Sequence, residues 1–403
     1  MNTLTPLSPT YWSSIMGEKL YKENVALNLC SRKEEASLKD GQIVDRPYRA
    51  DIYVGKYTKG TALTAQAITA TSDTLTVDQI FASLIYVDDV DKIQNKWDAA
   101  EAWSSEIVTR LSNQIDASIL FTGAYYASDS VDYNDIDGNQ AAGAAIPLSV
   151  SNVLKLFTTT KRKLTNSNVS NANRFFAMSS EVEEILLTYL AGRESVLGDK
   201  TGESGNIGHY MGFDLYVTNN LTGMVRWTPT DNPSNDETLI IDGVTLTFKD
   251  TLGVTSANVH IGAATANTLD ILVAAINAPS TSVAEDTNTG FVALSGSDLA
   301  KAERGWFAVD GTTYIDIYFK GGSYPVVAGT AQATLTYEKQ LCLAGEKKAI
   351  DVVIQQNPSV KMASTVSAGK DGMNILPKAL WGAKVFHDMA VRLLRVEIDS
   401  SSY

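Results

Sequence analysis

Cysteine and long apolar runs are both scarce in this sequence of 403 residues. The two cysteines, Cys30 and Cys342, are too few for a disulfide framework and fit a protein made in a reducing cytoplasm. No apolar run approaches the length of about 20 residues that a membrane-spanning helix needs. The first residues also lack the basic start and apolar stretch of a signal peptide. We therefore expect a soluble chain without a membrane span.

Basic residues are outnumbered: 33 lysines and arginines stand against 46 acidic residues, and the formal net charge is −13 at pH 7. A surface that binds nucleic acid through its phosphates carries the opposite charge. The densest basic cluster, residues 161–163, is interpreted as a solvated helix end. This balance argues against a protein built to bind DNA or RNA tightly.

Histidine is rare, and the three histidines are His209, His260 and His387. None lies within metal-ligand spacing of another histidine or a cysteine. The sequence also contains no G-x-S-x-G and no H-E-x-x-H pattern. We therefore predict no metal, no cofactor and no catalytic residues. A soluble enzyme whose catalytic groups converge only in the folded chain stays an alternative.

Two segments resemble binding loops but fail in detail. Around residues 135–138, a calcium loop would place Tyr133 and Ala144 at its first and twelfth ligand positions, and neither side chain suits calcium. The spaced glycines at 202, 205 and 208 precede a predicted strand, and no Lys-Ser/Thr pair follows them. Both segments are predicted to be turns or loops without a ligand.

The composition that remains is globular, with 44% apolar and 20% charged residues. The longest predicted element is a helix over Asp89–Tyr126, where apolar or small residues recur at steps of three and four. Neither proline nor glycine interrupts it before Gly123. Its length of about 50–57 Å at 1.5 Å per residue means that other elements must be arranged along it.

The segments before this helix predict parts that reach outward. Residues 6–28 form a short amphipathic segment, which must dock on the body of this chain or on another copy. Residues 43–87 predict a long β-hairpin with two strands of about 12 residues and a loose tip at residues 59–72. An isolated two-stranded hairpin is marginal in water, and no third strand is evident in the sequence. We therefore expect this hairpin to be buried against a neighbouring subunit.

After the long helix the chain alternates between helices and strands. The patterns predict a helix at residues 148–165, a strand at 174–178 followed by a helix, and a strand at 213–218. From about residue 222 to 339 the sequence pattern changes to short alternating strands, one helix and their turns. This predicts an inserted α+β module with a hairpin turn at Asp242-Gly243. The final segments predict strands at 349–355, 382–386 and 389–398, and a further short one at 362–367. These strands would complete a sheet begun before the insert.

This order of parts resembles the major capsid protein of tailed bacteriophages, a family with the Hong Kong 97-type coat fold. The order of the matching motifs carries the resemblance, since each motif is degenerate alone. They are Leu20–Ala26 in the arm, Gly41–Pro47 entering the hairpin, Ile85–Gln94 entering the helix, Gly208–Leu221 before the insert, and Ala349–Lys361 and Gly382–Ile398 at the end.

The resemblance implies an α+β fold of this type with an extra inserted α+β domain. The inserted domain resembles the one carried by coat proteins of the Salmonella-phage podovirus type. The implied parts are an N-terminal arm (1–42), an extended β-hairpin or E-loop (43–88), the spine helix and peripheral domain (89–145), an axial domain (146–221), the inserted domain (222–339) and the return strands of both domains (340–403).

The resemblance also implies partners and a location. Copies of the chain would form hexamers and pentamers of an icosahedral virion head around double-stranded DNA, without sequence-specific DNA contacts. A scaffolding protein and a portal protein would be further partners, and no membrane is involved. Because the arm begins almost at Met1, a separate scaffolding protein is expected instead of a long cleaved N-terminal segment. The protein would be made in the host cytoplasm.

The predicted intersubunit contacts lie in the arm and the hairpin. Charged side chains there would meet acidic residues of a neighbour, and each exposed pair contributes about 0–1 kcal/mol. Covalent crosslinking through Lys56, Lys59 and Asn357 is not predicted, because such residues are common. A phage tail-tube or adhesion protein is the other alternative, although the long helix disfavours its mainly β architecture. The predicted contact residues are Trp12, Leu20, Arg46, Tyr48, Arg49, Tyr53, Lys56, Tyr57 and Lys59.

Overall fold

The computed structural model describes residues 24–38, 41–49, 52, 54–60, 62, 65–66, 70–88, 99–192, 208–321, 327–367 and 370–399. Trp12, Leu20, Tyr53 and the first part of the predicted long helix, residues 89–98, lie outside these ranges, and so does the side chain of Arg49. The described strands form four sheets of two, four, six and nine strands. Together with the helices they make an α+β chain, as predicted.

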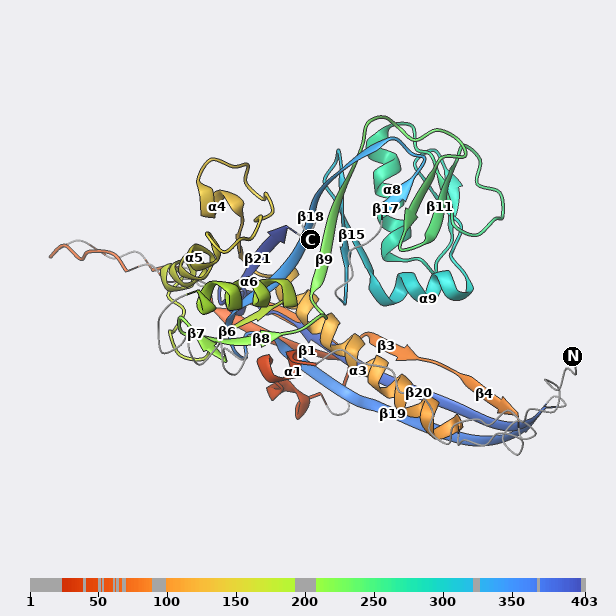
Figure 1. Ribbon diagram of the computed structural model, residues 1–403, viewed down its shortest axis with the longest axis horizontal. Helices are drawn as coiled ribbons and strands as arrows, with labels where there is room; N and C mark the ends of the chain where they lie inside the picture. Colours follow the sequence, from red (N-terminus) through yellow and green to blue (C-terminus); the bar gives the residue numbers. More distant parts are fainter. Residues whose placement is uncertain are drawn as a thin grey trace, which may run out of the picture.

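The elongated lower part of the molecule is one long helix on a four-stranded sheet. In Figure 1, α3 (Ala99–Tyr125) lies along the long strands β19 (Asp351–Ser367) and β20 (Lys370–Lys384). Strands β3 (Gln79–Ala82) and β4 (Ile85–Asp88) both pair with β20. The short helix α1 (Ala26–Leu29) and the turn η2 (Lys33–Glu35) pack beside them.

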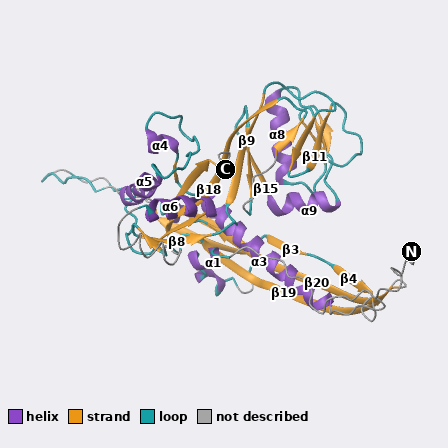
Figure 2. Cartoon of the chain, in the orientation of Figure 1, coloured by secondary structure: helices purple, strands orange, loops and turns teal. Residues whose placement is uncertain are grey.

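A nine-stranded sheet forms the centre of the molecule. Its main path runs β15-β16-β9-β18-β6-β8-β7, and β21 pairs with both β18 and β5. The helices α5 and α6 lie beside it on the left of Figure 2. The bounds are β5 Asp129–Val131, α4 Tyr133–Asp137, α5 Val153–Asn166, β6 Arg174–Met178, α6 Ser180–Ala191, β7 His209–Tyr210, β8 Phe213–Val217, β9 Thr222–Pro229, β15 Trp306–Asp310, β16 Ile315–Phe319, β18 Ala333–Glu346, α10 His387–Ala390 and β21 Leu393–Asp399.

Residues 222–339 build a second hydrophobic core, at the upper right of Figure 1. The strands β9 and β18 run from the central sheet into it and pair with each other. A six-stranded sheet of order β13-β14-β12-β11-β10-β17 packs there with helices α8 and α9. The bounds are β10 Thr238–Ile241, β11 Val244–Lys249, β12 Asn258–His260, α8 Thr265–Asn277, β13 Val283–Asp286, β14 Thr289–Phe291, α9 Gly296–Gly305 and β17 Val327–Gly329.

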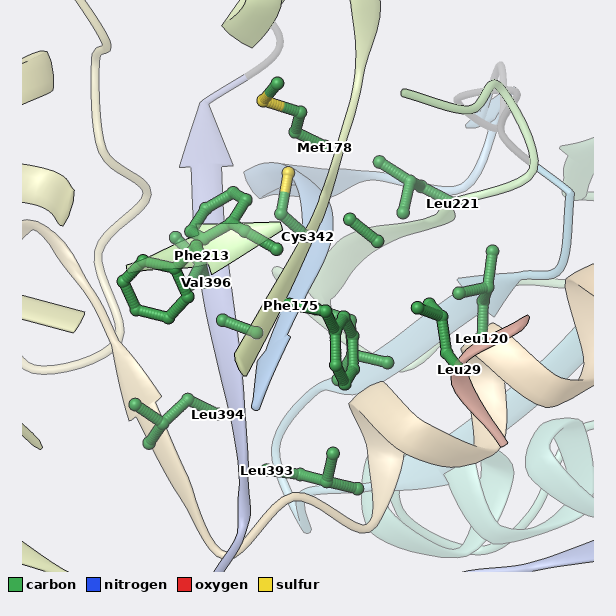
Figure 3. Packing of buried hydrophobic residues seen from close by; sticks show 14 of the residues in the cluster. Leu29, Leu120, Phe175, Met178, Phe213, Leu221, Cys342, Leu393, Leu394 and Val396 are labelled. Carbon is green, nitrogen blue, oxygen red and sulfur yellow. The ribbon is translucent and has the colours of Figure 1, made fainter. Parts of the chain in front are cut away.

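The predicted apolar stripe of the long helix is confirmed in α3, where Leu111, Ile115 and Ile119 are buried. The C-terminal half of α3 is buried on nearly every side, since Leu120 and Ala124 are also covered. Figure 3 shows Leu29 of α1 against Leu120, with Phe175 and Cys342 of the central sheet in the same core. Neighbouring elements on all sides therefore fix the end of α3.

Gly123 lets α3 approach the central sheet closely. A Cβ atom at this position would lie 2.7 Å from Cδ1 of Ile350 and 2.7 Å from Cδ2 of Leu343. We expect Gly123→Val to lower the free energy of unfolding by about 1–3 kcal/mol, the usual cost of overpacking a core. Chemical denaturation measures it. The control is Gly305→Ala in α9, where the atom nearest to an added Cβ is 3.9 Å away. This variant should change the free energy of unfolding little. An unchanged free energy of unfolding in Gly123→Val would contradict the close approach of α3 to the central sheet.

The predicted long hairpin is only partly correct. Strands β1 (Ile43–Arg49) and β2 (Ala70–Thr76) pair over seven residues, from Ile43 opposite Thr76 to Arg49 opposite Ala70. Strand β2 thus begins inside the predicted loose tip. Residues 79–88, predicted as the rest of the second hairpin strand, pair with β20 instead. Residues 79–88 therefore do have a further strand beside them, which the sequence did not reveal. It is β20, about 300 residues later in the chain.

The closing strands are longer than predicted. The predicted strands 349–355 and 362–367 are parts of one 17-residue strand, β19, and 382–386 is the end of the 15-residue strand β20. Each of these strands contains a proline, Pro358 in β19 and Pro377 in β20. Pro358 lies at a register shift on the edge strand β19, and Pro377 lies where β3 ends and β4 has not begun. A proline at such positions removes no ladder hydrogen bond.

Short-range predictions agree well with the structure. Helix α5 and strands β6 and β8 lie where the patterns place them. The turn at Asp242-Gly243 has φ values of 48° and 73°, which suit a tight two-residue hairpin. The predicted strand 389–398 is corrected to α10 followed by β21. Helix α9 was missed, because only Ala302 within it is buried. The described helices include none long and apolar enough to cross a lipid bilayer.

Candidate intersubunit surfaces

The chain between β1 and β2 projects away from the body as an arm, here called the β1–β2 arm (residues 50–69). Figure 1 shows it leaving the left side of the molecule. Its described apolar side chains are largely exposed: Ile52 by 62%, Val54 by 97% and Tyr57 by 58%. The sheet of β1 and β2 has no third strand among the described residues. Apolar side chains held in water on a projecting segment are typical of a contact surface.

The base of the arm is fixed to its own chain. Arg46 Nη1 lies 3.2 Å from Asp351 Oδ2, and Arg46 Nη2 lies 3.7 Å from Asp388 Oδ2. The same guanidinium sits 4.8 Å from the ring centre of Phe386. Tyr48 stacks on His387, with 4.8 Å between ring centres and an angle of 11°. These contacts set the direction in which the arm leaves the body.

Asp73 of β2 adds a second anchor on the same side. Its carboxylate lies 3.1 Å from Lys384 Nζ and accepts a hydrogen bond of 3.1 Å from the backbone N–H of His387. Burial raises the pKa of Asp73, but these donors outweigh burial and hold the pKa below its ordinary value of 3.8. The carboxylate therefore stays charged and paired to a lower pH than an ordinary aspartate would.

The predicted contact residues fall into three groups. Arg46 and Tyr48 contact their own chain, so the structure gives them an anchoring role, and their contact with a neighbour stays a prediction. Lys56, Tyr57 and Lys59 are exposed on the arm, as an intersubunit role requires. The contacts predicted for Trp12, Leu20, Arg49 and Tyr53 lie outside the described side chains.

Removing the charge of Arg46 should loosen the arm. The side chain of Asp351 is only 5% exposed and would lose the guanidinium of Arg46 in Arg46→Met, which keeps the alkyl stem. Since Arg46 itself is 34% exposed, we expect a loss of about 1–2 kcal/mol in the free energy of unfolding. Amide hydrogen exchange in β1 and β2 should become faster. Lys56→Met, an exposed lysine on the arm, is the control and should leave both measurements unchanged.

The described part of the N-terminal segment also docks on its own chain. The backbone N–H of Ala26 donates to Asp116 Oδ1 at 2.7 Å, and Asn220 Nδ2 donates to Asp116 Oδ2 at 2.9 Å. Asn220 also donates to Asn24 Oδ1 at 3.3 Å. Asp116 is 1% exposed, and burial raises its pKa despite these hydrogen bonds. One carboxylate thus joins the N-terminal segment, α3 and the central sheet.

Residues 222–339 are held to the body by aromatic rings and buried charges. Phe121 of α3 meets Phe307 edge to face at 5.3 Å and Tyr318 at 6.1 Å. The buried Lys339 and Glu397 line one small cavity with Tyr318 and form an ion pair, and burial lowers the pKa of Lys339. Contacts of both kinds at one junction fix the orientation of this part on α3.

Sequence reasoning missed the anchoring carboxylates Asp116, Asp351 and Asp388. Asp116 did carry a signal, because it is an acidic residue between the buried Ile115 and Ala117 of an apolar stripe. The other two carried none, since their partner Arg46 lies more than 300 residues away in sequence. Among the described residues, no three histidine, cysteine, aspartate or glutamate side chains gather as metal ligands.

Comparison with known proteins gives a result at the level of structure only. No protein-family model and no curated protein matches the chain. A solved structure from Mycobacterium phage Che8 is 15% identical with a TM-score of 0.58, covering 96% of each chain. The capsid structure of the cyanophage P-SCSP1u is 13% identical with a TM-score of 0.54, covering 99% of this chain and 95% of that one. A structure from Mycobacterium phage Ogopogo is 10% identical with a TM-score of 0.51, covering 99% of both chains.

Proposed function

We propose that this chain, whose fold is that of phage capsid proteins of the Hong Kong 97 type, is a major capsid protein that assembles into the icosahedral head of a bacteriophage. The observation that carries the proposal is the match over 99% of the chain to a phage capsid structure. The exposed arm gives independent support, because its apolar side chains need a second molecule for their burial. The role is structural, and no catalytic step is part of it.

Assembly by this chain would rest on contacts between unlike surfaces of identical copies. Such heterologous contacts close into rings when the rotation between copies allows it. Rings of six and five copies, the hexamers and pentamers of the proposal, would then join into a closed shell. The rigid unit is α3 with β19 and β20, and the β1–β2 arm is the device that reaches the next copy.

The finer division of the chain follows the same proposal. The peripheral domain would be α3 with the four-stranded sheet, and the axial domain would be the part of the central sheet outside residues 222–339, with α5 and α6. Residues 222–339 would be the inserted domain, and their separate core supports this. We place the boundary between the first two nearer Tyr126 than residue 145, because β5 at Asp129–Val131 pairs with β21 of the central sheet.

The proposed partners include a scaffolding protein, a portal protein and the packaged DNA. The formal net charge of −13 supports a wall that encloses DNA without binding its phosphates tightly. The location of the assembled protein would be the virion, after synthesis in the host cytoplasm.

Size-exclusion chromatography and negative-stain electron microscopy test the function. We expect the purified full-length chain, expressed alone and together with the other head genes of its phage, to give ring-shaped capsomers or closed regular particles. Open tubes would support a tail-tube protein instead. A chain that stays monomeric in both preparations at all concentrations would contradict the proposal.

A further inference from the structure

A small cavity of about 120 Å³ lies on one face of the central sheet, where four adjacent strands carry charged side chains. The strands are β16, β9, β18 and β21, of which the last three are labelled at the centre of Figure 1. Because alternate residues of a strand point to the same face, each strand contributes two residues. Together with Ala142 and Gly143, the lining residues are Asp316, Tyr318, Met224, Arg226, Lys339, Leu341, Arg395 and Glu397.

The charged groups around this cavity do not balance. Three are cations, Arg226, Lys339 and Arg395, and two are carboxylates, Asp316 and Glu397, which leaves a formal excess of one positive charge. The side chains of Lys339 and Glu397 are 5% and 3% exposed, so water screens this excess poorly. Burial lowers the pKa of Lys339, and the two neighbouring arginines lower it further against the raising effect of Glu397. The three cations therefore repel one another.

The two carboxylates are already paired. Asp316 accepts from Arg226 with both oxygens, at 2.7 Å from Nε and 2.8 Å from Nη2. Glu397 accepts from Arg395 Nε at 2.9 Å with Oε1, and from the ammonium group of Lys339 with Oε2. Each carboxylate oxygen thus has a donor, and the excess charge remains.

Two donor groups at the cavity have no acceptor among the described residues. Arg395 donates through Nε, and neither Nη1 nor Nη2 has a partner in the described part of the chain. The same holds for the hydroxyl of Tyr318, a residue that is only 7% exposed. Burial raises the pKa of Tyr318 to about 12, so this hydroxyl keeps its proton and can donate. Donors of this kind beside an uncompensated positive charge are what an anion requires.

We propose that the cavity binds one small monovalent anion, such as chloride, between Arg395 and Tyr318. One negative charge cancels the excess, and the volume is sufficient for such an ion with water beside it. Water alone could accept the same hydrogen bonds, but it would leave the positive charge uncompensated. Solvent can reach the site, because Arg226 and Arg395 are 23% and 27% exposed.

The bound ion would join two parts of the chain. Strands β9 and β16 belong to residues 222–339, whereas β21 belongs to the body of the molecule. An anion held between Tyr318 of β16 and Arg395 of β21 would therefore stabilise the attachment of residues 222–339. This inference does not depend on the proposed capsid function.

Salt exchange tests the site on the unassembled full-length chain. An anion that binds only the folded chain raises its unfolding temperature. The gain in sodium chloride over sodium gluconate of equal ionic strength should be about 1–3 °C larger for the wild type than for Arg395→Met. This variant removes the excess charge and both Nη donors, while Glu397 keeps Lys339 as its partner. The matched control Arg392→Met removes an arginine that pairs with Glu346 outside the cavity, and should respond like the wild type.

Chlorine NMR gives a second readout that does not depend on stability. The chloride line should broaden with the wild type and with Arg392→Met, and added bromide should reverse the broadening by competition. Tyr318→Phe, which keeps the ring and removes only the hydroxyl, should weaken chloride binding several-fold, and it replaces Arg395→Met should that variant not fold. Equal salt responses and equal line widths in the wild type and these cavity variants would overturn the proposal and leave water as the occupant. Either result leaves the capsid function standing, because both measurements precede assembly.

Discussion

Replacing residues 52–66 by a short Gly-Ser linker is expected to leave a folded monomer that forms no closed particles. The replaced segment contains exposed apolar residues and lies beyond the last pair of the hairpin, Arg49 opposite Ala70. The core and the anchors of the arm therefore stay intact, while the surface proposed to contact the next copy is lost. A deletion of residues 60–72 is a poorer design, because Ala70–Ser72 belong to β2.

Three measurements follow this variant: thermal unfolding by circular dichroism, size-exclusion chromatography and negative-stain microscopy. We expect an unchanged unfolding transition, a monomer peak and no particles. A matched pair of point variants separates surface chemistry from simple exposure. Val54 is 97% exposed on the arm and Val254 is 95% exposed elsewhere, so only Val54→Ser should reduce particle yield. Normal particles from the shortened arm would defeat the assignment of the arm as an assembly device.

Replacing Asp116 by alanine is expected to cost about 2–5 kcal/mol of unfolding free energy, because it leaves buried donors without an acceptor. The donors are the backbone N–H of Ala26 and the amide of Asn220, each within 2.9 Å of the carboxylate. The N-terminal segment should detach first, which faster hydrogen exchange at α1 would detect. Asp270→Ala, at an exposed position on α8, is the control and should stay within about 0.5 kcal/mol of the wild type.

The pH dependence of the Asp116 variants follows from the raised pKa. Because burial raises the pKa of Asp116 above 3.8 in the folded chain, the folded state binds this proton more tightly than the unfolded state. The contribution of Asp116 to the unfolding free energy therefore grows as the pH falls through its folded pKa, and is complete below 3.8. Wild type minus Asp116→Asn should show this growth in denaturation experiments from neutral to acidic pH. A difference that is constant with pH would contradict the burial of a titrating carboxyl group.

Asp73 should behave in the opposite way. Its folded pKa is lowered from 3.8, so its contribution to stability is present above 3.8 and is lost as the pH falls through the folded pKa. The two carboxylates therefore give opposing slopes with pH in one molecule. The arm anchor weakens in acid, while the N-terminal anchor does not.

The amino-acid sequence by itself determined the elements whose information is local. The helical stripe of α3, the hairpin turn at Asp242-Gly243 and the strand β6 lie where the patterns predict them. The order of these elements was also enough to predict the capsid-type fold that the structural matches support. Hydrophobic periodicity and turn-forming residues involve only residues close together in the sequence, so they can be recognised without a structure.

Only the tertiary structure decided which elements meet. Strands β3 and β4 pair with β20, and Arg46 pairs with Asp351, which is 305 residues away. A sequence pattern shows which side chains seek burial or a partner, but every strand offers the same backbone donors and acceptors to any other. Which strands pair depends on how the whole chain packs around α3, because only the complete packing gives every buried polar group a partner. For this reason the base of the arm proved to be fixed on its own chain, while Ile52, Val54 and Tyr57 beyond it stay exposed.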